Sequence, residues 1–205
     1  MFQSPARYPV WDLFIRLFHW LLVAGFAACW ISAELGKLDL HQLFGVGILS
    51  LLMFRILWGL VGSETARFSQ FVRGPSAALA YLRGRLHSVG HNPLGGWSVL
   101  ILLSLILSQA FSGLMNADDI YFEGVLYPYV SDSMTDLAAV VHEIAFDALL
   151  VFVGLHIAAI VFYRLRGKNL VKPMLTGYGE ESPATPPPPA LRGLLIAIIS
   201  VAVTW

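Results

Sequence analysis

One apolar stretch, from Val140 to Arg166, constrains this chain more than any other part of it. It has the length and composition of a helix that spans a membrane, and it contains two histidines, His142 and His156. Because 14 residues separate them, both imidazoles lie on one face of the helix, roughly 21 Å apart along its axis. Ionisable side chains are expensive inside a lipid-spanning helix, so this pair indicates a function.

The composition agrees with an integral membrane protein. Of the 205 residues, 57% are hydrophobic and 13% are charged, whereas a soluble domain carries about a quarter charged residues. The first apolar run shows no clear signal-peptide cleavage site, so we interpret it as an uncleaved span. The sequence therefore predicts an all-α transmembrane protein with four membrane-spanning helices. The predicted spans are Leu13–Ala33, His41–Leu60, Leu94–Leu114 and the stretch from Val140 to Arg166.

The cationic residues are distributed very unevenly between the loops. With the N-terminus in the cytoplasm, 12 of the 13 Lys and Arg residues fall on the cytoplasmic side, and only Lys37 falls outside. The positive-inside rule therefore predicts a multi-pass protein with a cytoplasmic N-terminus. Eight acidic residues show the reverse bias and fall outside: Glu34, Asp39, Asp118, Asp119, Glu123, Asp132, Asp136 and Glu143.

The C-terminal part of the chain differs from the rest. We predict a transmembrane domain over residues 1–178, a Pro-rich linker over 179–190 and an apolar segment over 191–205. The apolar run of that segment, Leu194–Trp205, would rise only about 18 Å as a helix, which is short of a bilayer. It is either a partial fifth transmembrane helix or a piece that lies at the membrane interface.

The orientation assigns a depth to each histidine of the predicted spans. His19 and His156 lie near the cytoplasmic edge, and His41 and His142 lie near the outer edge. Two imidazoles that face each other at one level, from different helices, are the axial ligands of a bis-histidine haem. The pairing predicts two haem b groups, an outer one at His41/His142 and an inner one at His19/His156. Because Cys29 is the single cysteine, covalent CxxCH attachment is excluded and both haems are non-covalent.

These histidines have other interpretations. Each histidine taken alone is explained by a buried ring bonded to a carbonyl. A zinc or proton-relay site competes with haem, but the two pairs lie too far apart to share one ion. His87 and His91 have no partner at their depth, and we interpret them as solvated loop residues. Asp147 lies about 140° around its helix from His142, so it does not face the predicted haem.

Two further groups of residues are candidates for contact with haem. Glycines in the spans would let a flat porphyrin approach the backbone, although small residues also pack transmembrane helices. These glycines are Gly45, Gly47 and Gly154. Arginines near the cytoplasmic edge would pair with haem propionates, since guanidinium groups suit carboxylates, although anchoring at the interface explains them equally well. These arginines are Arg16, Arg55 and Arg67.

Six pieces of the chain, in order over about residues 9–177, resemble the bacterial cytochrome b561 and nickel-iron hydrogenase b-type cytochrome family. They are RLFHW around His19, HQLFGVGILSLLMFRILWGLVG from His41, ARFSQFVRGP, GHNPLGG, HEIAFDALLVFVGLHIAAIVFY and MLTG. The resemblance implies a four-helix bundle that holds two b haems. In the family, histidines of the first, second and fourth spans ligate the iron, and here those positions are His19, His41, His142 and His156.

The resemblance also implies a place in a bacterial inner-membrane respiratory chain. Such a protein exchanges electrons between the quinone pool and a periplasmic or membrane redox protein, for instance a cytochrome c or a hydrogenase. A quinone site is compatible with the sequence, which contains no specific motif for one, and no nucleic-acid partner is expected. The acidic, aromatic loop Asp118–Asp136 is a candidate docking surface for a basic partner, or else a plain solvated loop.

The sequence favours an electron-transfer subunit over a stand-alone enzyme. Two alternatives stay open. One is a self-contained quinone oxidoreductase that acts on a small substrate such as superoxide. The other is a membrane anchor without haem, for which the pairing of the histidines in depth would be accidental.

Overall fold

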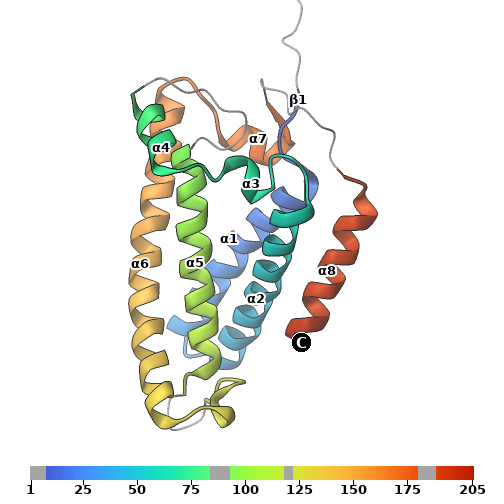
Figure 1. The fold of residues 1–205 in the computed structure, drawn as a ribbon. Helices are drawn as coiled ribbons and strands as arrows, with labels where there is room; N and C mark the ends of the chain where they lie inside the picture. The colour runs from blue at the N-terminus through green and yellow to red at the C-terminus, as the bar shows by residue number, and fades with distance from the viewer. Residues whose placement is uncertain (1–7, 84–92, 118–121, 180–187) are drawn as a thin grey trace, which may run out of the picture.

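Four long helices form an antiparallel bundle in the computed structural model, which describes residues 8–83, 93–117, 122–179 and 188–205 (Figure 1). Each of the four is long and apolar enough to cross a membrane. The predicted all-α four-helix architecture is therefore confirmed. The helices are α1 (Leu13–Glu34), α2 (Leu38–Val61), α5 (Pro93–Met115) and α6 (Asp132–Leu165).

Short elements cover one end of the bundle. Two short helices follow α2 in the chain, α3 (Phe68–Phe71) and α4 (Pro75–Leu82). Pro75 starts α4 because a proline suits the first turn of a helix, where its missing N–H costs nothing. At the same end α7 (Val171–Thr176) leads into the strand β2 (Tyr178–Gly179), which pairs antiparallel with β1 (Tyr8–Pro9). The 3-10 turn η1 (Tyr127–Tyr129) lies at the opposite end.

Local sequence explains how α1 begins and ends. Asp12 is the N-cap, and its side chain accepts a 2.9 Å hydrogen bond from the backbone N–H of Ile15. A short polar side chain at this position satisfies a donor that the helix itself leaves unpaired. After α1, Gly36 adopts φ 65°, a left-handed conformation that glycine takes without steric cost. This turn reverses the chain so that α2 returns alongside α1.

Helix α6 is longer than its apolar stretch. It begins at Asp132, whereas the predicted span begins at Val140, so His142 lies within the helix and does not open it. At 1.5 Å per residue, its 34 residues extend about 51 Å, well beyond the roughly 30 Å of a bilayer core. Hydropathy indicates only the part of the helix that lies in lipid. The negative charge of Asp132 in the first turn stabilises the N-terminus of the helix beyond that part.

Helix α2 contributes more buried residues to the packed interior than α1, α5, α6 or α8. Leu52 of α2 and Leu149 of α6 are almost completely buried, and they pack with residues of α1 and α5 at mid-bundle. A second cluster forms near the other end of α2 around Trp58, which is fully buried against Phe14 and Phe54. Few other side chains of α1, α5 and α6 are buried, and many of them are apolar and exposed or partly exposed, as a surface in contact with lipid requires.

The C-terminal apolar segment forms a helix, α8 (Ala190–Thr204), which packs on the outside of α2 (Figure 1). Close approach is possible at Gly193, where an added Cβ would lie 2.3 Å from the Phe14 ring. Within the apolar surface, Ser50 of α2 hydrogen-bonds with Thr204 and accepts a 3.2 Å bond from the Trp205 indole. At 15 residues, α8 is shorter than a full span. Most of the predicted linker, residues 180–187, lies outside the described residues.

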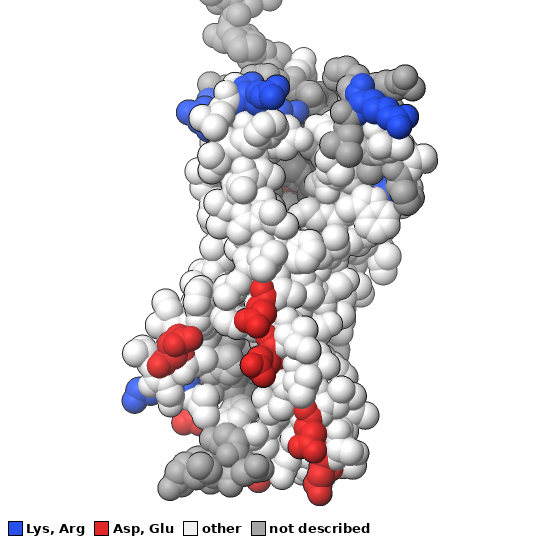
Figure 2. Space-filling model, turned by 90° about the vertical axis from the view of Figure 1, so that its left-hand side faces the viewer, with Lys and Arg blue, Asp and Glu red and all other residues white. Residues whose placement is uncertain are grey.

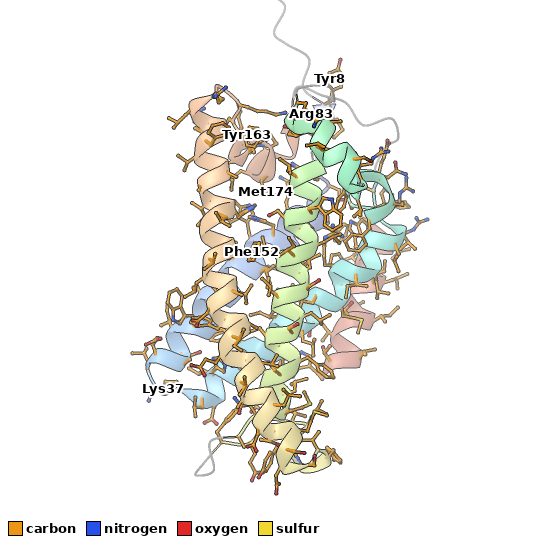
Figure 3. The ribbon with its side chains drawn as sticks, turned by 60° about the vertical axis from the view of Figure 1, so that its left-hand side comes forward. Tyr8, Lys37, Arg83, Phe152, Tyr163 and Met174 are labelled. Atoms are coloured by element: carbon orange, nitrogen blue, oxygen red, sulfur yellow. The ribbon has the colours of Figure 1, made fainter. Side chains whose placement is uncertain are left out.

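Charge divides the bundle into two ends. Figure 2 shows acidic side chains in a row on one half of the molecule and Lys and Arg at the opposite end. Lys37 lies with the acids, as the sequence predicts (Figure 3). We call the end with α3, α4 and α7 the basic end, and the end with η1 and Lys37 the acidic end.

Candidate functional site

His41 of α2 and His142 of α6 meet near the acidic end of the bundle. Their ring centres lie 6.1 Å apart, and the ring planes are inclined by 75°. Two imidazoles that bind one metal ion at about 2.0–2.1 Å from nitrogen to metal have ring centres roughly 6 Å apart. The structure therefore brings together the two histidines that share the outer depth, at a separation that fits a single iron between them.

Hydrogen bonds fix the orientation of both rings. His41 Nδ1 lies 2.9 Å from the backbone carbonyl of Cys29 on α1, and His142 Nδ1 lies 3.0 Å from that of Gln109 on α5. Because a carbonyl oxygen only accepts, we assign the proton to Nδ1 in each ring. Each Nε2 then carries the lone pair, and this is the state in which a neutral imidazole binds a metal.

A small residue makes room for this arrangement. A Cβ added to Gly113 of α5 would lie 3.0 Å from His142 Cε1, so a larger side chain would press on the ring. The same sites do not suit zinc: within the described ranges, no three His, Cys, Asp or Glu side chains gather as a metal-binding group. A pair of histidines with free Nε2 atoms fits haem iron, whose other four ligands come from the porphyrin.

His19 of α1 and His156 of α6 form the second level, towards the basic end. The two side chains are close enough to interact electrostatically. His19 packs edge-on against Trp20, with ring centres 4.9 Å apart, and its Nδ1 is buried without a hydrogen-bond partner among the described residues. Phe152 lies on α6 between the two histidine levels, with Met174 of α7 closer to the basic end (Figure 3). Among the described residues, no carbonyl anchors the second pair as Cys29 and Gln109 anchor the first.

Unpaired cationic donors gather at the basic end. In the described part of the chain, six buried polar side-chain atoms have no hydrogen-bond partner, and three of them belong to arginines. They are Arg16 Nε, Arg55 Nη1 and Arg67 Nε. Buried donors are normally satisfied, so such a group indicates an acceptor that the protein alone does not supply. The two propionates of a haem have the required charge and oxygen atoms.

The surroundings of Arg16 and Arg55 differ. Arg16 Nη1 donates a 2.7 Å hydrogen bond to the carbonyl of Leu175, next to α7. Arg55 is 3% exposed, and its guanidinium lies 4.6 Å from the centre of the Phe68 ring, within electrostatic reach of Asp12. A cation stacked on an aromatic face is stabilised by the ring quadrupole. Both arginines are therefore fixed by protein contacts on one side and retain an unpaired nitrogen.

The three glycines that the sequence suggests for contact with haem border open space. A Cβ added to Gly45, Gly47 or Gly154 would meet nothing within 4 Å outside its own helix. These positions therefore do not serve close packing between helices, unlike Gly25, whose added Cβ would lie 3.3 Å from Ile48. Gly45 lies one turn after His41, on the same face of α2.

Several contacts were not foreseen from the sequence. Ser32 and Ser112 donate to the two carbonyls that anchor the histidines. At the basic end, Asp12 accepts a 3.1 Å hydrogen bond from the Trp58 indole and another from the Ser63 hydroxyl. Backbone carbonyls have no sequence signature, and these side chains are far apart in the chain. His87, His91, Asp118 and Asp119 lie outside the described residues.

The comparison with protein families identifies the chain. The family model for prokaryotic cytochrome b561 matches residues 10–177, which include all four histidines of the two levels. A search of curated proteins found no match. The match covers most of the chain, and the bundle of membrane-length helices agrees with it. The chain therefore belongs to the prokaryotic cytochrome b561 family, and it is a b-type cytochrome of the membrane that works in electron transfer.

Proposed function

We propose that this chain is a di-haem electron-transfer subunit that moves electrons between the quinone pool and a redox partner protein. The observation that carries the proposal is the His41/His142 pair, with ring centres 6.1 Å apart and each Nδ1–H engaged by a carbonyl. In both rings Nε2 is left to bind a metal. A pair of rings whose orientation the protein already fixes suits an iron that changes its charge without changing its ligands.

The four histidines have two roles in this proposal. His41 and His142 bind the iron of the haem at the acidic end, and His19 and His156 bind the iron at the basic end. Each haem, when bound, supplies a one-electron ferric/ferrous couple. Two histidines held on each iron would leave no position for oxygen, and each site would therefore favour electron transfer over oxygen chemistry.

The arginines and glycines assist in binding. Arg16, Arg55 and Arg67 each retain a buried, unpaired nitrogen at the basic end, which supports their pairing with haem propionates. Gly45 leaves the face of α2 beside His41 open for a flat ring system. The surrounding apolar side chains keep water away, and a low dielectric around the iron is one determinant of its reduction potential.

The charge distribution supports an orientation. The basic end lies on the cytoplasmic side of a bacterial inner membrane, and the acidic end faces the periplasm. The N-terminus is then cytoplasmic. In this orientation, haems held at the two histidine levels would connect a quinone in the membrane with a partner at one of the two ends.

Purification followed by pyridine haemochrome analysis tests this function. We expect two b haems per chain and a reduced-minus-oxidised spectrum of b type, which a quinol analogue produces without a second protein. A colourless preparation would contradict the proposal and point to a membrane anchor. Turnover of superoxide with quinone by the purified chain alone would instead favour a self-contained oxidoreductase.

The acidic end carries a surface suited to a basic partner. Three exposed acids of α6 lie within about 40° of one another on the helix surface. Together with exposed Glu123, they form what we call the acidic face: Glu123, Asp132, Asp136 and Glu143. Tyr129 of η1, 83% exposed, lies in the same segment of the chain. Negative charge of this kind steers basic redox proteins towards their docking site.

We therefore expect the rate of electron transfer to a basic soluble cytochrome c to fall with ionic strength. Replacing Asp132, Asp136 and Glu143 together by lysine should lower the second-order rate about tenfold or more at low salt and remove the salt dependence. The matched control is Lys37→Glu, at the same end of the bundle, which should leave the rate unchanged or raise it. A wild-type rate that does not respond to salt would exclude electrostatic docking. Stopped-flow absorbance measures all of these rates.

A further inference from the structure

The histidine pair at the acidic end is held by two matching sets of three groups. On α1, the carbonyl of Cys29 accepts from His41 Nδ1 at 2.9 Å and from the Ser32 hydroxyl at 2.8 Å. On α5, the carbonyl of Gln109 accepts from His142 Nδ1 at 3.0 Å and from the Ser112 hydroxyl at 3.1 Å. Each serine follows its carbonyl by three residues, so the same device occurs on both sides of the pair.

Both serines are buried within spans that are otherwise apolar. Ser32 is 5% and Ser112 is 3% exposed, and Ser112 Oγ also lies 3.2 Å from His142 Nδ1. A serine in a helix often bonds a preceding carbonyl of its own helix, so this bond alone carries no function. Ser200 shows the ordinary case: its hydroxyl donates to the Ile196 carbonyl at 2.8 Å, and no histidine of the described residues donates to that carbonyl.

The shared carbonyl connects each hydroxyl to its imidazole. A strong Nδ1–H···O=C bond draws the proton towards the carbonyl, makes Nε2 more basic and thereby stabilises ferric iron. A second donor on the same carbonyl withdraws electron density from it and weakens it as an acceptor for the histidine. The hydroxyl therefore reduces the electron donation of the imidazole to the iron.

We propose that Ser32 and Ser112 are positioning residues that raise the reduction potential of the haem at the acidic end, acting through the carbonyls they share with His41 and His142. This inference rests on the proposed function, because it requires haem between those histidines. His19 has no such partner on Nδ1 in the described structure. The two serines would therefore make the reduction potentials of the two haems differ.

Optical redox titration of the purified full-length protein tests the inference. In Ser32→Ala and in Ser112→Ala we expect the midpoint potential of one haem to fall. At a fixed ambient potential near that midpoint, its ferric-to-ferrous ratio should rise about twofold to tenfold, the range that one hydrogen bond supports. The double variant should show the larger shift, and the second haem should titrate as in wild type. The conservative variants Ser32→Thr and Ser112→Thr, which keep the hydroxyl, should restore the potential.

Ser200→Ala is the matched control, because it removes a buried serine with a back-bond of the same kind on α8. An unchanged or raised potential in both single variants, at full haem content, overturns the inference, as does an equal fall in Ser200→Ala. Electron paramagnetic resonance of the ferric haems adds a second readout, in which the g-values of the affected haem should move. A wild-type protein without haem would overturn the proposed function itself, and this outcome is separate from a failure of the serine variants.

Discussion

Replacing His142 by alanine is expected to leave the purified protein with about one haem per chain in place of two, because iron at the acidic end then has a single protein ligand. His41→Ala should have the same effect, and the double variant His41→Ala/His142→Ala should still retain one haem. Pairing one variant from each level, such as His41→Ala with His156→Ala, should remove both. Pyridine haemochrome quantitation against protein concentration measures the ratio.

The haem content of the double variants tests which histidines share one haem. If His41→Ala/His142→Ala removes both haems while His41→Ala/His156→Ala retains one, the pairing by depth is wrong, even if all four histidines bind iron. His87, which the sequence places outside the spans, provides the control, and His87→Ala should keep two haems. Retention of the helical circular dichroism signal separates loss of a haem from loss of the fold.

Replacing Asp12 by alanine is expected to cause the largest loss of stability of the changes considered. The carboxylate caps α1, accepts from the buried Trp58 indole and from Ser63, and lies near the guanidinium of Arg55. Arg55 is 3% exposed, and a buried charge that loses its partner costs about 3–5 kcal/mol. Thermal unfolding in detergent should show a midpoint lower by several degrees.

Two further substitutions separate the contributions of Asp12. Asp12→Asn keeps an acceptor for the helix cap but removes the charge, so it should lie between wild type and Asp12→Ala. Asp136→Ala removes an exposed carboxylate of α6 and should change the free energy of unfolding by about 0.5 kcal/mol or less. Equal midpoints for Asp12→Ala and Asp136→Ala would mean that the cluster around Asp12 contributes little.

The spans and the depths of their histidines could be predicted because both follow from one-dimensional patterns. Hydropathy places each span, and helical periodicity places His142 and His156 on one face. The distribution of cations predicts which end of each span lies on the cytoplasmic side of the membrane. Hydropathy was less informative about helix ends outside lipid. It placed the start of the last span at Val140, but the helix begins at Asp132, since a polar helix can extend into water.

The details of the candidate site could not be predicted, for two physical reasons. The carbonyls of Cys29 and Gln109 belong to the backbone, so no residue type reveals that they anchor His41 and His142. Asp12 bonds with Trp58 and Ser63 across sequence separations of 46 and 51 residues. Helical periodicity relates only residues within one helix, so it could not predict these contacts. Sequence patterns therefore pointed to the candidate histidines, and only the three-dimensional arrangement revealed what holds His41 and His142.

The location of the two anchoring carbonyls has a consequence for biogenesis. His41 is fixed by α1, its neighbour in the first helical hairpin, and His142 is fixed by α5, its neighbour in the second. If these histidines bind haem as proposed, each hairpin would complete its own half of the site on insertion, the N-terminal half first. At either level, the two histidines belong to different hairpins. In the proposed di-haem protein, haem would therefore join two halves that are inserted one after the other, and its uptake would favour the assembled bundle over separated hairpins by mass action.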